Sequence, residues 1–213
     1  MPTPVFSALR KATHPLPATR STAGRAAIRV EPTRADEVVA SAAARTANPS
    51  LQKLARGLSW GADEKVWLAL TSVGWLATRA QSSSVRRTAN HALLVTVVVS
   101  ALPHVLKSMF NQTRPDRQTL RGHLNGVQLS GKAEDAFPSG HALHMGALFS
   151  AASPLPPRPR AVVRSVAVGL CLTRVMLLAH WLSDVVVGFI VGAGVERSLR
   201  PWTGYEQEGA SRK

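Results

Sequence analysis

Three short groups of polar residues stand at the borders of apolar stretches in this chain of 213 residues. Charged side chains are costly beside a core or a membrane, so their concentration at these borders indicates a functional site. Together the groups predict a phosphate-binding pocket with a histidine nucleophile. In chain order they read Lys-x6-Arg-Pro, Pro-Ser-Gly-His and Arg-x5-His-x3-Asp. The candidate site residues in them are Lys107, Arg114, Ser139, Gly140, His141, Arg174, His180 and Asp184.

Three cations and one helix start in these groups are suited to holding a phosphoryl group. Ser139 is a good helix N-cap, and Gly140 leaves the amides of the following helix unobstructed, which makes this helix start an anion site. The proline after Arg114 forces that arginine into an extended conformation that aims it away from the preceding helix. Arg174 adds a second guanidinium, whose planar fork matches phosphate oxygens, and Lys107 adds a third positive charge. These groups can neutralise a phosphoryl group by themselves, so we expect no cofactor and no metal ion.

The third group supplies a histidine with a carboxylate four residues further on. If His180 and Asp184 share a helix, the carboxylate can accept a hydrogen bond from one ring nitrogen while the other nitrogen faces the pocket. An oriented, neutral imidazole is a competent nucleophile toward phosphorus. His141, at the mouth of another helix, is then expected to donate the proton to the leaving alcohol. Each residue taken singly has an ordinary structural role, but the set with these spacings favours the catalytic interpretation.

Apolar segments separated by basic connections must position these residues. We expect an all-α bundle of about five helices, at residues 66–78, 91–106, 140–152, 161–178 and 181–195. Several segments have fewer than the roughly 20 uninterrupted apolar residues of a bilayer span, so hydropathy alone leaves a soluble bundle and a membrane bundle both open. Two details favour transmembrane helices. Residues 95–100 are almost wholly apolar, and Gly188-x3-Gly192 would let two helices approach closely in lipid.

The connections sort by charge when these helices are laid antiparallel. The positive-inside rule places the more basic side toward the cytoplasm. The three polar groups gather on the opposite side, so the pocket is expected at the periplasmic face of a bacterial inner membrane. An odd number of spans puts the N-terminal arm on the pocket side too, so either this arm is translocated or a segment before residue 66 dips into the membrane. The basic side receives Arg79, Arg86, Arg87, Arg158, Arg160, Arg197 and Arg200.

Composition limits the partners and the domain organisation. Lys and Arg number 26 against 12 Asp and Glu, which favours anionic partners. Nucleic acid is not expected, because no basic stretch is interleaved with aromatic residues. The single Cys171 forms no intrachain disulfide and is expected to be a buried hydrophobe.

The composition of residues 1–50 predicts a disordered basic arm, with one short helix possible over 36–45 and a transit peptide as the alternative. Residues 51–202 would form the catalytic domain, and 203–213 a polar tail.

The three groups resemble the signature of the type 2 phosphatidic acid phosphatase (PAP2) superfamily, which also contains bacterial acid phosphatases and vanadate-dependent haloperoxidases. Every signature position is filled, with Thr173 where the family commonly has serine, so the hydroxyl is kept. The resemblance covers roughly residues 51–202 and says nothing about the first fifty. It implies that the phosphate is bound by Lys107, Arg114, Arg174, Ser139 and Gly140, and that the acid, the nucleophile and its orienting partner are His141, His180 and Asp184.

These expectations combine into an integral membrane phosphatase that hydrolyses a lipid phosphate monoester or diphosphate through a phosphohistidine intermediate, without a metal. A soluble phosphomonoesterase with the same site is one alternative. The apolar helices argue against it, as does the absence of a continuous apolar signal-peptide core in residues 1–30. The other alternative is a non-catalytic membrane protein that binds lipid headgroups, and an intact His180 with Asp184 argues against that. The sequence leaves the lipid and the oligomeric state open.

Overall fold

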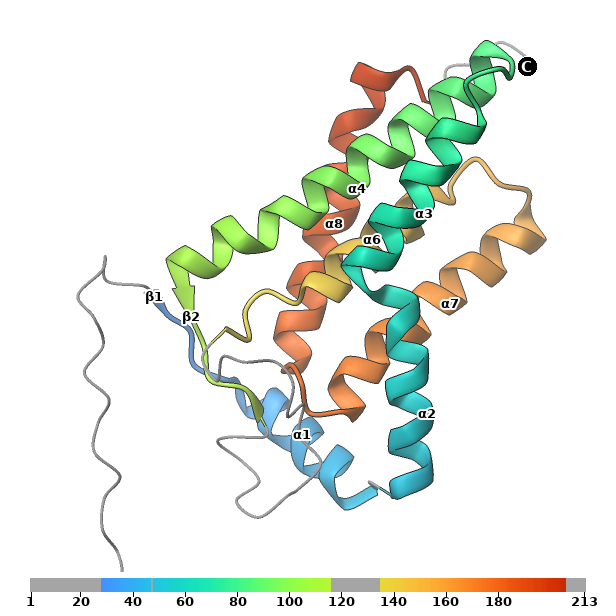
Figure 1. Ribbon diagram of the computed structural model, residues 1–213. Helices are drawn as coiled ribbons and strands as arrows, with labels where there is room; N and C mark the ends of the chain where they lie inside the picture. Colours follow the sequence, from blue (N-terminus) through green and yellow to red (C-terminus); the bar gives the residue numbers. More distant parts are fainter. Residues whose placement is uncertain (1–27, 47, 116–134, 206–213) are drawn as a thin grey trace, which may run out of the picture.

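In the computed structural model the described residues are 28–46, 48–115 and 135–205, and they fold into a helical bundle with one two-stranded sheet (Figure 1). The elements occur along the chain in the following order: β1 (Ile28–Arg29), α1 (Arg34–Thr46), α2 (Pro49–Ser59), the 3-10 turn η1 (Trp60–Ala62), α3 (Glu64–Ala77), α4 (Ser83–Met109), β2 (Phe110–Asn111), α6 (Gly140–Ala151), α7 (Pro157–Met176) and α8 (Leu182–Thr203).

The five helices expected from the sequence are confirmed as α3, α4, α6, α7 and α8. Two of them, α4 and α8, extend well beyond their apolar segments. Helix α4 begins at Ser83 because Ser82 caps it, its side chain accepting a hydrogen bond from the amide of Val85 at 3.4 Å. Helix α8 continues past residue 195 through the ion pair of Glu196 with Arg200 at 2.8 Å, one turn apart, and Gly204 in the left-handed conformation ends it. Apolar periodicity does not register such polar turns.

Helix α6 is the centre of the bundle, since residues 142–147 are all buried and α3, α4, α7 and α8 pack around them. Glycines bring α6 and α8 into backbone contact. A Cβ added to Gly192 would lie 1.9 Å from the carbonyl oxygen of Leu143, and one added to Gly146 would lie 1.9 Å from that of Phe189. The close approach expected at the Gly188-x3-Gly192 pair is therefore confirmed.

Large apolar side chains cover the outer faces of the bundle. Soluble monomers rarely expose large contiguous apolar patches, whereas lipid-facing helices carry exposed apolar side chains as a rule. By length and composition, α4 with its 27 residues is the one helix in the described part of the chain that qualifies as a membrane span. The exposed apolar residues of the bundle helices include Leu70, Val73 and Leu76 of α3, Leu94, Val97 and Val105 of α4, Val162, Val166 and Leu172 of α7, and Val186 and Ile190 of α8.

The N-terminal arm is shorter than the sequence suggested. The segment from Ile28 is folded, because β1 pairs in parallel with β2 and α1 packs on α7 and α8. The short helix considered possible over 36–45 is present as α1. Contacts with residues far away in the chain help to hold the segment, and its composition could not indicate them. The tail is also shorter, since the hydroxyl of Tyr205 donates to the carbonyl oxygen of Ala151 at 2.7 Å. Residues 1–27 and 206–213 lie outside the described residues.

The two ends of the bundle differ in chemistry. At one end, here called the basic end, the indole nitrogen of Trp75 donates to Asn90 at 2.9 Å, and Arg200 donates to the carbonyl oxygen of Ser150 at 2.7 Å. These contacts join the end of α3, the start of α4, the end of α6 and the last turns of α8, so the arginine-rich connections gather as expected (Figure 1). The other end, here called the site end, carries the three polar groups together with α1 and α2.

Candidate active site

The turn between α7 and α8 places His180. Leu178 adopts the left-handed conformation with φ 54°, a costly geometry for a branched side chain. The chain reverses there, and the amides of Ala179 and His180 both return to the carbonyl oxygen of Arg174, at 3.0 and 3.4 Å. Leu178 is buried, so packing holds this turn in place. His180 is thereby directed into the protein instead of continuing along α7.

Hydrogen bonds join the three polar groups at the site end. Arg114 of the first group donates to the carbonyl oxygen of Ala179 at 2.7 Å. The amide of Ser139, in the second group, donates to the carbonyl oxygen of Asp184 at 3.3 Å. The indole nitrogen of Trp181 donates to the carbonyl oxygen of Thr113 at 2.8 Å. Residues separated by up to about seventy positions in the chain are thus held in one constellation, as the sequence predicted.

The imidazole of His180 is buried and held in one tautomer. Its Nδ1 lies 2.7 Å from the carbonyl oxygen of Ala136. A carbonyl oxygen can only accept a hydrogen bond, so Nδ1 carries the proton and Nε2 keeps a free lone pair. Burial, followed by the positive charges of Arg174 and Arg114, lowers the pKa of His180 well below its ordinary value. The ring is therefore neutral at pH 7 and its Nε2 is available as a nucleophile.

Asp184 lies beside His180, but its closest hydrogen bond is elsewhere. Its Oδ2 stands 3.6 Å from Nδ1 of His180, whereas it accepts a hydrogen bond from the amide of Trp181 at 2.9 Å. The carboxyl group therefore caps the start of α8 while it stays close to the ring. In this structure the carbonyl oxygen of Ala136 orients the imidazole. Asp184 is positioned to stabilise the positive charge that the ring acquires on reaction.

The three expected cations lie around the histidines, and two of them share a carboxylate. Asp135 accepts from Arg114 at 2.8 Å and lies 3.5 Å from the Nζ of Lys107. No sequence pattern singled out Asp135, because it precedes the second group without a motif of its own. Arg174 donates to the hydroxyl of Ser59 at 2.7 Å, and its buried Nε has no hydrogen-bond partner among the described residues. That N–H is an open donor for a phosphate oxygen.

The start of α6 completes the constellation. Ser139 is the N-cap of this helix as expected, its hydroxyl accepting from the amide of Ala142 at 3.4 Å. Gly140 and His141 follow in the first turn, where backbone amides point out of the helix. His141 and Lys107 both lie close enough to His180 to influence its ionisation. The pocket therefore combines two imidazoles, three cations and a helix N-terminus.

Asp36 in α1 is a buried acidic residue beside this site that sequence patterns did not reveal. Its carboxylate accepts from the amide and the hydroxyl of Ser183, at 2.8 and 2.9 Å, and from the amide and hydroxyl of Thr33, both at 2.8 Å. Burial alone would raise the pKa of Asp36, but these hydrogen bonds outweigh it and lower the pKa below its usual value. Asp36 thus fixes the first turn of α8, next to His180, from a helix about 150 positions away in the chain.

Replacing Asp36 with alanine should therefore lower both stability and turnover. The amide and hydroxyl of Ser183 would lose their acceptor, which costs about 3 kcal/mol. A shift of the turn that carries His180 should reduce kcat on the order of 10- to 100-fold, with less effect on KM. Thermal unfolding in detergent and steady-state kinetics measure these effects. Alanine at Glu37, the exposed neighbour of Asp36, is the control, and an unchanged kcat in the Asp36 variant would show that α1 does not position the site.

Comparison with protein families decides where this constellation belongs. The family model described as the PAP2 superfamily matches residues 88–208. The chain belongs to the PAP2 superfamily. The match contains all eight expected site residues, and the superfamily suggested by the three motifs is confirmed.

Solved structures agree on the fold. A transmembrane PAP2-type phosphatidylglycerolphosphate phosphatase from Bacillus subtilis is 22% identical with a TM-score of 0.59, and the comparison covers 80% of this chain and 85% of that one. LpxE of Aquifex aeolicus is 20% identical with a TM-score of 0.56, covering 76% of this chain and 92% of that one. The all-α bundle is thus the PAP2 fold seen in transmembrane phosphatases.

Curated relatives are more similar in sequence over a shorter stretch. A lipid A 1-phosphatase of Rhizobium johnstonii is 41% identical over 103 residues, and a second one, of Rhizobium etli, is 40% identical over 102 residues. Each alignment covers 47% of this PAP2 chain, and 42% and 44% of the respective relative. The chain therefore spans less than half the length of the curated relatives that it matches.

Proposed function

We propose that this protein is an integral membrane phosphatase that removes a phosphate group from a lipid through a phosphohistidine on His180, without a metal ion. The observation that carries the proposal is the tautomer of His180. Its Nδ1 donates to the carbonyl oxygen of Ala136 at 2.7 Å, which leaves the lone pair of Nε2 free. The positive charges of Arg174, Arg114 and Lys107 act on this imidazole. A buried, neutral imidazole with one free nitrogen is arranged for attack on phosphorus.

The reaction follows from the positions of these groups. Arg114, Arg174 and Lys107 bind the oxygens of the phosphoryl group and offset the charge that accumulates during transfer. Binding of the phosphate dianion offsets the positive charges around His141 and lets this imidazole take up a proton from water. The lone pair of Nε2 of His180 then forms a bond to phosphorus while the bond to the lipid oxygen breaks, and His141 gives that oxygen its proton. A water molecule, losing its proton to His141, then cleaves the phosphorus–nitrogen bond and releases inorganic phosphate.

The carboxylate of Asp135 has to move or be displaced before Arg114 and Lys107 can bind the phosphate. Asp135 holds Arg114 and Lys107 at 2.8 and 3.5 Å, so its oxygens lie where phosphate oxygens would otherwise be bound by these cations. Binding of the doubly charged phosphate replaces one negative charge with two, which favours the exchange.

The substrate we infer is a lipid phosphate reached from the outer leaflet of a bacterial inner membrane. The apolar belt of the bundle supports the membrane location and disfavours the soluble phosphomonoesterase. The basic end supports an orientation with the site toward the periplasm. Among lipids, the 1-phosphate of lipid A is the leading candidate, because both curated relatives carry that activity in their names. The intact His180 site disfavours a protein that only binds headgroups.

Purified protein should therefore release phosphate from lipid A or another lipid phosphate with at least about 100-fold higher kcat/KM than from a short water-soluble monoester. Binding energy from the lipid body becomes available at the transition state, whereas the soluble ester lacks it. The measurement is phosphate release in mixed micelles, with and without EDTA. Equal rates on both substrates would contradict a lipid phosphatase, and activity lost in EDTA and restored by a divalent cation would contradict the metal-free mechanism.

The same assay in sealed vesicles tests the orientation. Right-side-out vesicles should hydrolyse lipid phosphate supplied from outside, and inside-out vesicles should do so only after detergent is added. The opposite pattern would place the site toward the cytoplasm.

A further inference from the structure

A groove of about 340 Å³ opens between α7 and α8 toward the basic end, away from the catalytic residues. The residues from Asp184 to Arg197 span ~20 Å along the axis of α8, which is the distance between the site and the head of this groove. No described residue of the catalytic constellation takes part in its lining. The lining side chains that matter below are Phe149 of α6, Arg164 of α7, and Phe189, Ile190, Gly194 and Arg197 of α8.

The deeper part of the groove is apolar and has a flat, open wall. Phe149 and Phe189 pack edge to face, with ring centroids 5.2 Å apart. Ile190 is 64% exposed beside them, and a Cβ added to Gly194 would meet no atom within 4 Å. Gly194 therefore leaves a strip of the α8 surface without side chains, and no neighbouring helix in the described part of the chain packs against it. Gly192, by contrast, is in contact with the backbone of α6. This shape suits a flexible hydrocarbon chain.

The head of the groove is positively charged. The guanidinium of Arg164 stacks on Phe149, 4.6 Å from the ring centroid, and donates to the carbonyl oxygen of Phe149 and the hydroxyl of Ser153, both at 3.3 Å. Arg197 is exposed and has no hydrogen bond or ion pair with any residue of the described ranges. Neither arginine has a carboxylate partner among those residues.

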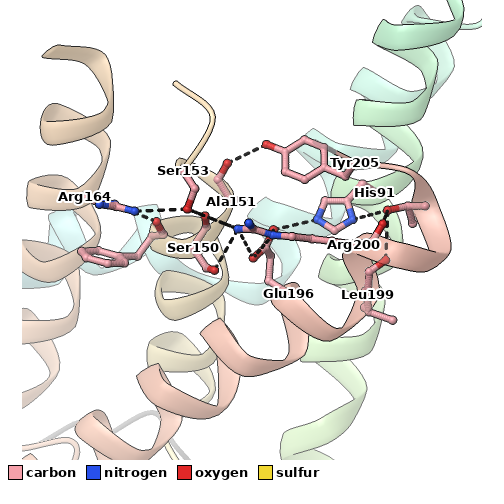
Figure 2. A network of polar contacts seen from close by, with 11 residues as sticks. His91, Ser150, Ala151, Ser153, Arg164, Glu196, Leu199, Arg200 and Tyr205 are labelled. Carbon is pink, nitrogen blue, oxygen red and sulfur yellow. Dashed lines mark hydrogen bonds and ion pairs between the residues drawn. The ribbon is translucent and has the colours of Figure 1, made fainter. Parts of the chain in front are cut away.

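The acidic residue that precedes Arg197 in the chain, Glu196, is paired with other groups. Figure 2 shows Glu196 within a network that includes His91 and Arg200. Glu196 is fully buried, lies 2.8 Å from Arg200 and is 3.0 Å from Nε2 of His91. Its charge is therefore balanced by Arg200 and His91, and the network reaches Arg164 only through the hydroxyl of Ser153, which accepts from Arg200 at 3.4 Å and from Arg164 at 3.3 Å. Two uncompensated guanidinium groups remain above an apolar groove on a lipid-facing surface.

We propose that this groove binds one anionic phospholipid of the cytoplasmic leaflet, with Arg164 and Arg197 on its phosphate and one acyl chain along Phe189, Ile190 and Gly194. The charge at the head matches a phosphodiester, and the bare helix surface beneath it matches the chain. The site lies on the opposite leaflet from the catalytic pocket, so it serves a resident lipid instead of the substrate. It depends on the membrane location but not on the reaction assigned to His180.

Native mass spectrometry of the purified full chain in detergent, titrated with dioleoylphosphatidylglycerol, tests this site. We expect one molecule to be retained at high affinity, and dioleoylphosphatidylcholine to be retained at least about tenfold more weakly. Two variants address the two parts of the groove. The double variant Arg164→Gln with Arg197→Gln removes the charges, and Gly194→Leu fills the chain strip while adding a better helix former. Each should weaken retention of phosphatidylglycerol by about tenfold or more.

The matched control removes two arginines of the basic end that do not line the groove, in the double variant Arg86→Gln with Arg158→Gln. It should bind phosphatidylglycerol as the parent chain does, and all variants should retain lipid phosphatase activity. If the control loses as much lipid as the groove variant, general charge attraction explains the binding and the proposal fails. Equal retention of both lipids, or a groove variant that changes the oligomeric mass while lipid binding is unchanged, would also overturn it.

Glycerophosphoglycerol, which has the headgroup without chains, tests the apolar part of the groove. It should not compete at equal concentration, and full competition would show that the apolar strip is not used.

Discussion

Replacing His180 with alanine is expected to reduce kcat for phosphate release by at least about 10⁴-fold. The variant lacks the only nitrogen that we propose to attack phosphorus, and the cations that remain can bind the phosphate but cannot form a covalent intermediate. A brief reaction of the parent protein with ³²P-labelled lipid phosphate should leave label on the protein that is stable in alkali and released in acid, as a phosphorus–nitrogen bond requires. The His180 variant should carry no such label.

An exposed histidine provides the matched control for this experiment. His104 lies on α4, and its side chain is 75% exposed. Alanine at this position should leave kcat within about twofold of the parent value. Thermal unfolding of both variants separates chemistry from folding, because His180 also donates to the carbonyl oxygen of Ala136. Appreciable turnover by a folded His180 variant would refute the nucleophile. Label that survives in that variant would place the covalent step on another residue.

A methyl group at position 192 should damage the protein severely, because α6 and α8 are in backbone contact there. In Gly192→Ala the new Cβ would lie 1.9 Å from the carbonyl oxygen of Leu143, so α6 and α8 must separate by roughly 1.5 Å to restore an ordinary contact. The atoms that the new methyl group would meet belong to the backbone of Leu143, which cannot rotate away as a side chain could. We therefore expect the free energy of unfolding to fall by about 3 kcal/mol or more. The same interface carries Ser139 and Asp184, whose backbones are hydrogen-bonded at 3.3 Å. We therefore expect a lower Tm in detergent together with a loss of kcat.

Gly169 supplies the control for this substitution. It also lies inside a helix, α7, but a Cβ added there meets no atom within 4 Å. Alanine at that position should stabilise the protein slightly, by about 0.5–1 kcal/mol, because alanine favours the helical conformation. Differential scanning calorimetry and phosphate release on the same preparations compare the two variants. A Gly192 variant with the Tm and kcat of the parent would mean that the helices are not in the close contact that the structure describes.

The sequence by itself determined the five bundle helices and the superfamily, and it picked out the polar residues that the structure brings together. Apolar periodicity locates helices because a packed or lipid-facing surface demands apolar residues at regular spacing, and the five bundle helices lie where this pattern placed them. The motifs identified the superfamily, because phosphoryl transfer by histidine needs cations, a helix start and an oriented imidazole in any chain that performs it. The spacing of Gly188 and Gly192 predicted a close contact between two helices. It did not predict which helix would be the partner of α8.

The tertiary structure alone decided how these parts are held. The carbonyl oxygen of Ala136 fixes the tautomer of His180, and a backbone group leaves no trace in a sequence pattern. Asp135 sits between two cations, and Asp36 reaches Ser183 from a segment whose composition suggested disorder. Such contacts join residues up to about 150 positions apart, and their energy exists only once the chain has folded and excluded water from them. Local propensity carries no information about them, because it reflects each segment in isolation from the rest of the chain.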